Sequence, residues 1–147
     1  MKLYTAPEAL PSHISLFLAG GISGCPDWQT DVLTGIQHQP DSLIVANPRR
    51  EIYSEEENAI KQIEWEHKAL KISDTVSFWF PQETLCPITL YELGVISERV
   101  NTNLIVGVHP NYKRKLDVET QLRLTRPEIK IVYSIQDLIT QINHTYK

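Results

Sequence analysis

The chain has 147 residues, of which 41% are hydrophobic and 22% charged, and its formal net charge is −4. This composition is that of an ordinary globular protein, and the length predicts a single domain over residues 1–147. The negative charge argues against nucleic acid as a partner, and no apolar run reaches the roughly 20 residues that a membrane-spanning helix needs. Two cysteines and a polar N-terminal stretch indicate a reducing compartment and no secretory signal, so we expect a cytoplasmic protein.

Short apolar runs alternate with amphipathic stretches along the chain. The first predicted elements are a strand at 14–19, a helix at 28–37, a strand at 43–46 and a helix at 55–72. They are followed by a strand at 75–80, a helix at 87–100, a strand at 104–108 and a short helix at 118–124. The last predicted elements are a strand at 129–133 and a helix at 135–143.

This alternation predicts the fold class. Strands that are apolar throughout are buried on both faces, which is typical of a parallel sheet with helices on both sides. Right-handed crossovers then give a three-layer, doubly wound α/β domain, flavodoxin-like or Rossmann-like, with a five-stranded parallel sheet. Ligands of such folds bind beyond the carboxyl ends of the strands. We therefore expect the functional site near Gly20, Gly21 and Asn47 and in the loop that precedes residue 87.

The paired glycines after the first strand would let a ligand approach the backbone N–H groups of Gly20 and Gly21. A tight turn is the alternative interpretation. The spacing matches neither the dinucleotide-binding nor the ATP-binding glycine motif, and the histidines show no metal-site spacing. We therefore expect no organic cofactor and no metal.

Glu92 is the first candidate catalytic residue. On a helical wheel it lies among Ile88, Val95 and Ile96, so its carboxylate projects from an apolar stripe just after a strand-end loop. A buried carboxylate must be paired or have a perturbed pKa. A salt bridge to an arginine is the structural alternative to a catalytic role.

Glu66 shows the same anomaly on the preceding helix. The predicted apolar face contains Ala59, Ile60, Ile63 and Leu70; Glu66 lies on or near it, whereas Trp65 is expected to point elsewhere. A partly exposed acid at the helix edge is the alternative. Two such carboxylates on consecutive helices suggest a shared site, because glycosidic chemistry commonly pairs an ionised acid with a protonated one.

Two further strand ends carry candidate binding residues. Arg49, which follows Asn47, could bind a phosphate or carboxylate, or it could hold one of the two glutamates in place. Trp79 could stack on a base near the end of its strand, although core packing explains it equally well.

Five segments, taken in their order along the chain, resemble the nucleoside 2-deoxyribosyltransferase family, including its 2-deoxyribosyltransferase-like branch. They span about residues 14 to 108, and the last third of the chain matches only in its strand–helix pattern. The matching segments are Leu16-Phe17-Leu18-Ala19-Gly20-Gly21, Asn47-Pro48-Arg49, Ile63-Glu64-Trp65-Glu66, residues 73–80, and Ile88-Thr89-Leu90-Tyr91-Glu92-Leu93-Gly94.

The resemblance implies a double displacement between a deoxynucleoside and a free nucleobase. Glu92 would attack C1′ of the sugar, and Glu66, with a pKa raised by burial, would handle the proton of the base. Gly20 and Gly21 would line the sugar–base pocket. The resemblance further implies no metal or organic cofactor and a homo-oligomer built on dimers, such as a tetramer or hexamer. A neighbouring C-terminal region often closes the site in this family, for which Tyr146 is a candidate here.

The chain departs from the family pattern at two positions. Phe17 stands where a tyrosine often hydrogen-bonds the nucleophile, and Asp27, Arg49 or Tyr91 could replace that donor. Cys86 stands where an aspartate often contacts the sugar hydroxyls. The full set of candidate substrate-binding residues is Phe17, Gly20, Gly21, Asp27, Trp28, Asn47, Arg49, Trp79 and Cys86.

Two other functions remain open on the sequence alone. The same two acids could hydrolyse the N-glycosidic bond of a nucleoside or nucleotide, in which case a phosphate would give Arg49 or Arg50 a purpose. Alternatively, the chain could be a nucleotide-binding module without catalytic activity.

Overall fold

The chain folds around one parallel β-sheet with helices on both faces. The structure is a computed structural model that describes residues 1–50 and 56–147. In this part of the chain the sheet has the strand order β1-β3-β2-β4-β5, and all pairs are parallel. The strands are β1 (Lys2–Thr5), β2 (Ile14–Gly20), β3 (Ile44–Asn47), β4 (Ser73–Phe80) and β5 (Asn103–Val108). The predicted doubly wound α/β fold with a five-stranded parallel sheet is therefore confirmed.

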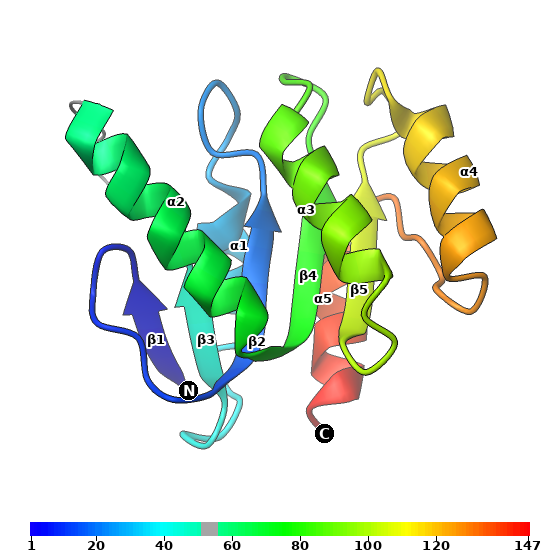
Figure 1. The fold of residues 1–147 in the computed structure, drawn as a ribbon. Coiled ribbons are helices and arrows are strands. Elements are labelled where there is room, and N and C mark those ends of the chain that lie inside the picture. The colour runs from blue at the N-terminus through cyan, green and yellow to red at the C-terminus, as the bar shows by residue number, and fades with distance from the viewer. Residues whose placement is uncertain (51–55) are drawn as a thin grey trace.

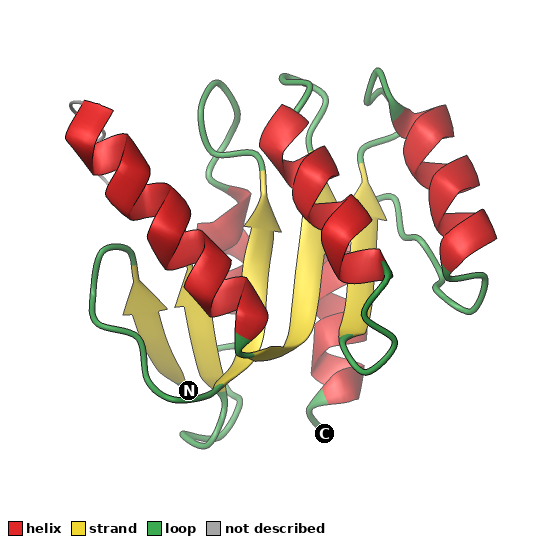
Figure 2. Cartoon of the chain, in the orientation of Figure 1, coloured by secondary structure: helices red, strands yellow, loops and turns green. Residues whose placement is uncertain are grey.

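The helices form the two outer layers (Figures 1 and 2). They are α1 (Trp28–Gly35), α2 (Glu56–Lys71), α3 (Pro87–Ser97), α4 (Lys115–Thr125) and α5 (Ile135–Thr145). Figure 1 shows α2, α3 and α4 in front of the sheet, with α1 and α5 behind it. Position 55, the predicted start of α2, lies outside the described residues. No helix in the described ranges is both long and apolar enough to cross a bilayer.

Each face of the sheet has its own hydrophobic core. Phe17 and Ala19 of β2 pack in the cluster on the α2–α3 face, whereas Leu16 and Leu18 pack in the cluster on the α1–α5 face. This alternation along one strand follows from the two-residue period of β-structure. All four side chains are almost fully buried, so β2 is the central strand of the molecule in packing as well as in topology.

The fifth strand is not the one expected. It is β1, a four-residue edge strand that pairs with β3, in a segment for which no strand was predicted. The predicted strand at 129–133 contributes only an isolated bridge between Val132 and Gly107. Its backbone hydrogen bonds to β5 run from Val132 N to Val106 O and from Val108 N to Val132 O, each 2.9 Å long. The chain there reaches β5 only briefly before α5 begins.

The buried face of α2 also differs from the prediction. Ile63 is 61% exposed and Ile60 is exposed as well, whereas Trp65 is only 8% exposed. The Trp65 ring lies 6.3 Å from that of Phe17, and its indole N–H donates to the carbonyl of Glu8 at 2.8 Å. Because the bulky indole takes the core position, the two isoleucines are rotated outward.

Candidate active site

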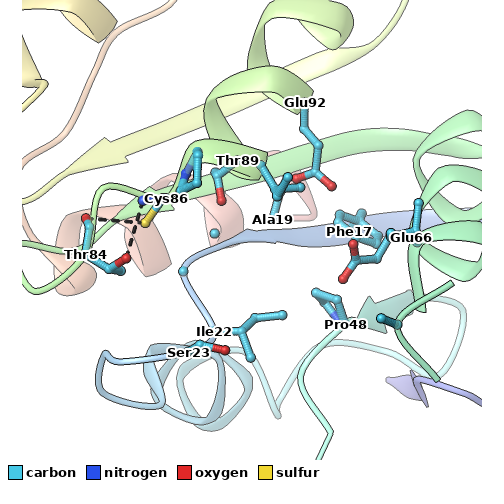
Figure 3. Close-up of a pocket in the computed structure, with 16 residues that line it drawn as sticks. Phe17, Ala19, Ile22, Ser23, Pro48, Glu66, Thr84, Cys86, Thr89 and Glu92 are labelled. Carbon is cyan, nitrogen blue, oxygen red and sulfur yellow. Dashed lines mark hydrogen bonds between the residues drawn. The ribbon is translucent and has the colours of Figure 1, made fainter. Parts of the chain in front are cut away.

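A pocket of about 300 Å³ opens beyond the carboxyl end of β2, at the front face of the sheet (Figure 3). The strand order reverses there, because β3 lies on one side of β2 and β4 lies on the other. Doubly wound folds bind their ligands at this kind of switch point. The pocket is lined by Phe17, Ala19, Gly20, Gly21, Ile22, Ser23, Pro48, Ala59, Ile63, Glu66, Thr84, Cys86, Pro87, Ile88, Thr89 and Glu92.

Glu92 projects into the pocket from the second turn of α3 (Figure 3). Burial raises the pKa of its carboxyl to about 8, and the negative charge of Glu66 adds to the increase. Its neighbours Ile88 and Val95 are exposed, so the carboxylate forms part of the pocket wall rather than of a core stripe. No described residue hydrogen-bonds to Glu92, which leaves it as a strongly perturbed acid without a donor.

Glu66 enters the same pocket from α2 (Figure 3). Burial raises its pKa as expected, but a hydrogen bond from Gln62 and the charge of Arg50 both act in the opposite direction. The amide nitrogen of Gln62 donates to Glu66 Oε1 at 2.8 Å. The two acids therefore share one cavity but differ in their partners, since Glu66 has a donor and a nearby cation.

Gly20 and Gly21 line the pocket, and the structure has no room for a side chain at either position. A Cβ on Gly20 would lie 2.5 Å from the Trp28 ring and 2.5 Å from the Trp79 carbonyl oxygen. A Cβ on Gly21 would lie 3.0 Å from the Sγ of Cys86. The glycines thus bring the backbone of the loop close to the two acids.

The loop after β2 is braced from behind by four predicted binding residues, none of which lines the pocket. The indole N–H of Trp28 donates to the carbonyl of Gly21 at 2.9 Å. Arg49 Nε lies 3.3 Å from Asp27, whose carboxylate also caps α1. The side chain of Asn47 accepts a bond of 3.0 Å from the Arg49 backbone N–H. These four residues therefore support the loop from outside the pocket lining.

Three candidates that sequence reasoning associated with the site lie elsewhere. Trp79 is buried in the core on the α1–α5 face, where its ring packs against Gly107. Tyr146 lies at the opposite end of β2, where its hydroxyl donates to the Ser15 carbonyl at 2.6 Å. Tyr91 is 72% exposed on the outer side of α3. None of the three lines the pocket.

Two other candidates, Phe17 and Cys86, line the pocket. The Phe17 ring forms the floor between the two acids and offers no donor to Glu92 (Figure 3). Cys86 is the N-cap residue that precedes α3, and its backbone is left-handed, with φ of 49°. Burial raises the pKa of its thiol to about 12, so the group is neutral at physiological pH.

The other lining residues that could contact a ligand were not predicted from the sequence. Ser23, Thr84 and Thr89 offer hydroxyl groups, and Pro48 and Ile22 form the side opposite Glu92 (Figure 3). Their residue types carry no signal of their own. Gln62, one helical turn before Glu66, could have been noticed as a polar residue at a helical position that reaches the acid.

The lining carries carboxyl, hydroxyl and thiol groups together with apolar walls. Within residues 1–50 and 56–147, no group of three histidine, cysteine or acidic side chains has the arrangement of a metal site. Two perturbed acids in one largely apolar cavity suit a proton transfer coupled to nucleophilic attack on a small organic molecule.

Comparison with known families identifies the relationship. The model of the family described as "nucleoside 2-deoxyribosyltransferase like" matches residues 13–112. No curated protein matches the chain. The matched region contains β2 to β5 and α1 to α3, and therefore both acids and the whole pocket lining. The chain belongs to the nucleoside 2-deoxyribosyltransferase-like family.

Proposed function

We propose that the protein transfers the 2-deoxyribosyl group of a 2′-deoxynucleoside between nucleobases, as a step of nucleotide salvage. The observation that carries the proposal is the pair of partly buried carboxyls, Glu66 and Glu92, that face one pocket in a chain of this family. A pocket of about 300 Å³ is at the lower end of the range for small-molecule sites. The two free cysteines support the cytoplasm as its location.

The proposed reaction has two displacements at C1′ of the sugar. A carboxylate oxygen of Glu92 forms a bond to C1′ while the bond from C1′ to the base nitrogen breaks. The departing base keeps the electron pair and takes a proton from Glu66. In the second displacement, a nitrogen of the incoming base attacks C1′, the ester to Glu92 breaks, and the proton of the incoming base returns to Glu66.

The pKa shifts of the two acids oppose the charge state that the reaction needs. Glu92 must be ionised to attack, yet its pKa is near 8 in the free protein. Glu66 must hold a proton to assist the base, yet Gln62 and Arg50 favour its ionised form. We propose that the reactive form has the proton on Glu66, and that a bound substrate, by hydrogen-bonding to Glu92, stabilises that form.

We further propose that the substrate is an uncharged nucleoside rather than a nucleotide. No basic side chain occurs among the pocket-lining residues that the structure describes. Arg49, the predicted phosphate ligand, is engaged by Asp27 at 3.3 Å, by Gln29 at 2.9 Å and by the carbonyl of Pro26 at 3.0 Å. A phosphate held beside two carboxyls, in a lining whose described residues include no basic side chain, is unfavourable.

Base exchange is tested by incubating the protein with deoxyinosine and free adenine and separating the products by chromatography. New deoxyadenosine supports the proposed function. Hypoxanthine released without deoxyadenosine would indicate hydrolysis by the same two acids. No turnover of any deoxynucleoside, together with measurable binding, would indicate a binding module.

The nucleoside preference is tested in the same assay with the 5′-monophosphate of deoxyinosine. We expect kcat/KM for the nucleoside to be at least about tenfold higher, because the phosphate would face an acidic cavity. The difference should shrink at high salt, which screens the repulsion. Equal or better use of the monophosphate would contradict the preference.

A homo-oligomer is also proposed, with a second copy covering the mouth of the pocket. Apolar side chains that are exposed on the two helices that carry the acids support it: Ile60 and Ile63 on α2, and Ile88, Tyr91 and Val95 on α3. Ile63 and Ile88 also line the pocket. Single exposed apolar residues are ordinary, but neighbouring ones on two adjacent helices mark an interaction surface.

Sedimentation velocity of the Ile63→Glu and Tyr91→Lys variants tests the oligomer. We expect both to sediment as smaller species than the wild type. Leu124→Lys on α4, which replaces an equally exposed residue away from the pocket, is the matched control. A wild-type protein that is monomeric at all concentrations would contradict the proposal.

A further inference from the structure

Gln62 lies behind Glu66 in α2 and is only 1% exposed. Its amide nitrogen donates two hydrogen bonds of 2.8 Å each, one to the carbonyl oxygen of Pro48 and one to Glu66 Oε1. Pro48 follows β3 and forms part of the pocket wall. Gln62 therefore ties the acid on the helix to the end of β3 beside it.

The two acceptors decide the orientation of this amide. Both hydrogens of the nitrogen are used, and no described residue hydrogen-bonds to Gln62 Oε1. Exchanging the oxygen and nitrogen would point a lone-pair-bearing oxygen at the Pro48 carbonyl and at the Glu66 carboxylate. Gln62 consequently acts as a donor to Glu66 and cannot accept a proton from it.

We propose that Gln62 is a positioning residue that holds Glu66 Oε1 as an acceptor and so reserves Oε2 as the oxygen that carries the proton. A proton on Oε1 would meet the N–H of Gln62, so the neutral form of Glu66 keeps its proton on the other oxygen. Oε2 accepts no hydrogen bond within the described residues and is free to donate to a bound base. The role in base departure rests on the proposed function, whereas the control over Glu66 does not.

The same contact determines where the proton of the pair rests before substrate binds. Arg50, from the segment after β3, lowers the pKa of Glu66, whereas the charge of Glu66 raises that of Glu92 on α3. Gln62 and Arg50 both favour ionised Glu66, while Glu92 has no hydrogen-bond donor within the described part of the chain. Because Glu66 has a donor and a nearby cation and Glu92 has neither among the described residues, we expect the proton of the pair to rest on Glu92 in the free protein, with Glu66 ionising at the lower pH.

The test is an NMR titration of protein labelled with ¹³C at the glutamate side-chain carboxyl, with signals assigned from Glu66→Gln and Glu92→Gln. In the wild type we expect Glu66 to titrate below Glu92. In Gln62→Leu, which removes the donor and keeps a side chain of similar size, the midpoint of Glu66 should rise by about one pH unit. Gln121→Leu, at an exposed glutamine on α4, is the matched control and should leave both midpoints unchanged.

Two results would overturn the proposal. One is a Glu66 midpoint in Gln62→Leu that equals that of the wild type. The other, which needs no folded Gln62 variant, is a wild type in which Glu92 titrates first. In the base-exchange assay we expect Gln62→Leu to lower kcat about tenfold with KM within about twofold, and to shift the pH profile with the Glu66 midpoint. Absence of base exchange alongside the expected titration would contradict the proposed function and leave the control over Glu66 intact.

Discussion

Replacing Glu92 by glutamine should make the protein more stable at alkaline pH, because the wild type must hold a charge in the pocket there. The pKa of Glu92 is about 8 in the folded chain against an ordinary value of 4.5. A folded-state pKa above the unfolded one means that the folded state binds the proton more tightly. This contribution to stability is complete below about pH 4.5 and is lost as the pH rises through about 8.

The magnitude follows from the distance between the two pKa values. At about 1.4 kcal/mol per pH unit, the full effect is roughly 4–5 kcal/mol. Because Glu92 is only partly buried, solvent screens its charge, so we expect about 2 kcal/mol at pH 9. Glutamine at position 92 does not titrate, so this loss of stability is absent from the variant. For a chain of this length the difference corresponds to about 4–8 °C in Tm.

The assay is urea denaturation of the wild type and of Glu92→Gln at intervals from pH 4.5 to 9. The free energy of unfolding of the variant should gain on that of the wild type as the pH rises. Glu64→Gln, at an exposed position of α2, is the control and should follow the wild type. Wild-type and Glu92→Gln curves that stay parallel across the range would refute the reasoning that Glu92 is neutral in the free protein.

Four further predictions concern the pocket, its support and helix α3. Glu66→Gln should lower kcat for transfer from deoxyinosine by about a hundredfold, since no proton reaches the departing base, and steady-state kinetics would measure this. Arg49→Ala should lower the free energy of unfolding by about 1–3 kcal/mol in urea, because Arg49 joins the segment after β3 to Asp27, to Gln29 and to the Pro26 carbonyl. Gly21→Ala should cost about 1–3 kcal/mol, because its Cβ would lie 3.0 Å from two sulfur atoms. Gly94→Ala, in open space on α3, should instead stabilise by about 0.5–1 kcal/mol.

The sequence predicted most of the sheet because its central strands are apolar on both faces. Segments such as β2 and β4 are buried along nearly their whole length, which makes their runs conspicuous. The edge strand β1 was missed because its first two residues, Lys2 and Leu3, are exposed and its remaining residues only half-buried. The segment 129–133 looks similar in sequence but is held to β5 by only two backbone hydrogen bonds.

The helix faces were harder to predict than the strands. Ile60 and Ile63 suggested a buried face of α2, but Trp65 occupies the core and the isoleucines face the pocket mouth and solvent. Apolar spacing identifies a face without stating what covers it. The same ambiguity affects α3, where Ile88 and Val95 are exposed.

The two acids could be found from sequence because a carboxylate at a buried helical position is chemically anomalous. The groups around them could not, since a serine, a proline or a glutamine carries no such anomaly. Arg49 and Asp27 show the opposite limit: their residue types suit ligand binding, but they satisfy each other behind the loop. Only the three-dimensional arrangement separates groups that contact the pocket from groups that support it.

The central claim, that Glu92 attacks the sugar, is tested most directly by trapping the intermediate. The protein is mixed with deoxyinosine, quenched in acid during turnover, digested and examined by mass spectrometry. We predict a peptide containing Glu92 that carries one 2-deoxyribosyl group as an ester, and its absence in Glu92→Gln. An adduct on Glu66 or another residue, or normal transfer by Glu92→Gln, would contradict the account.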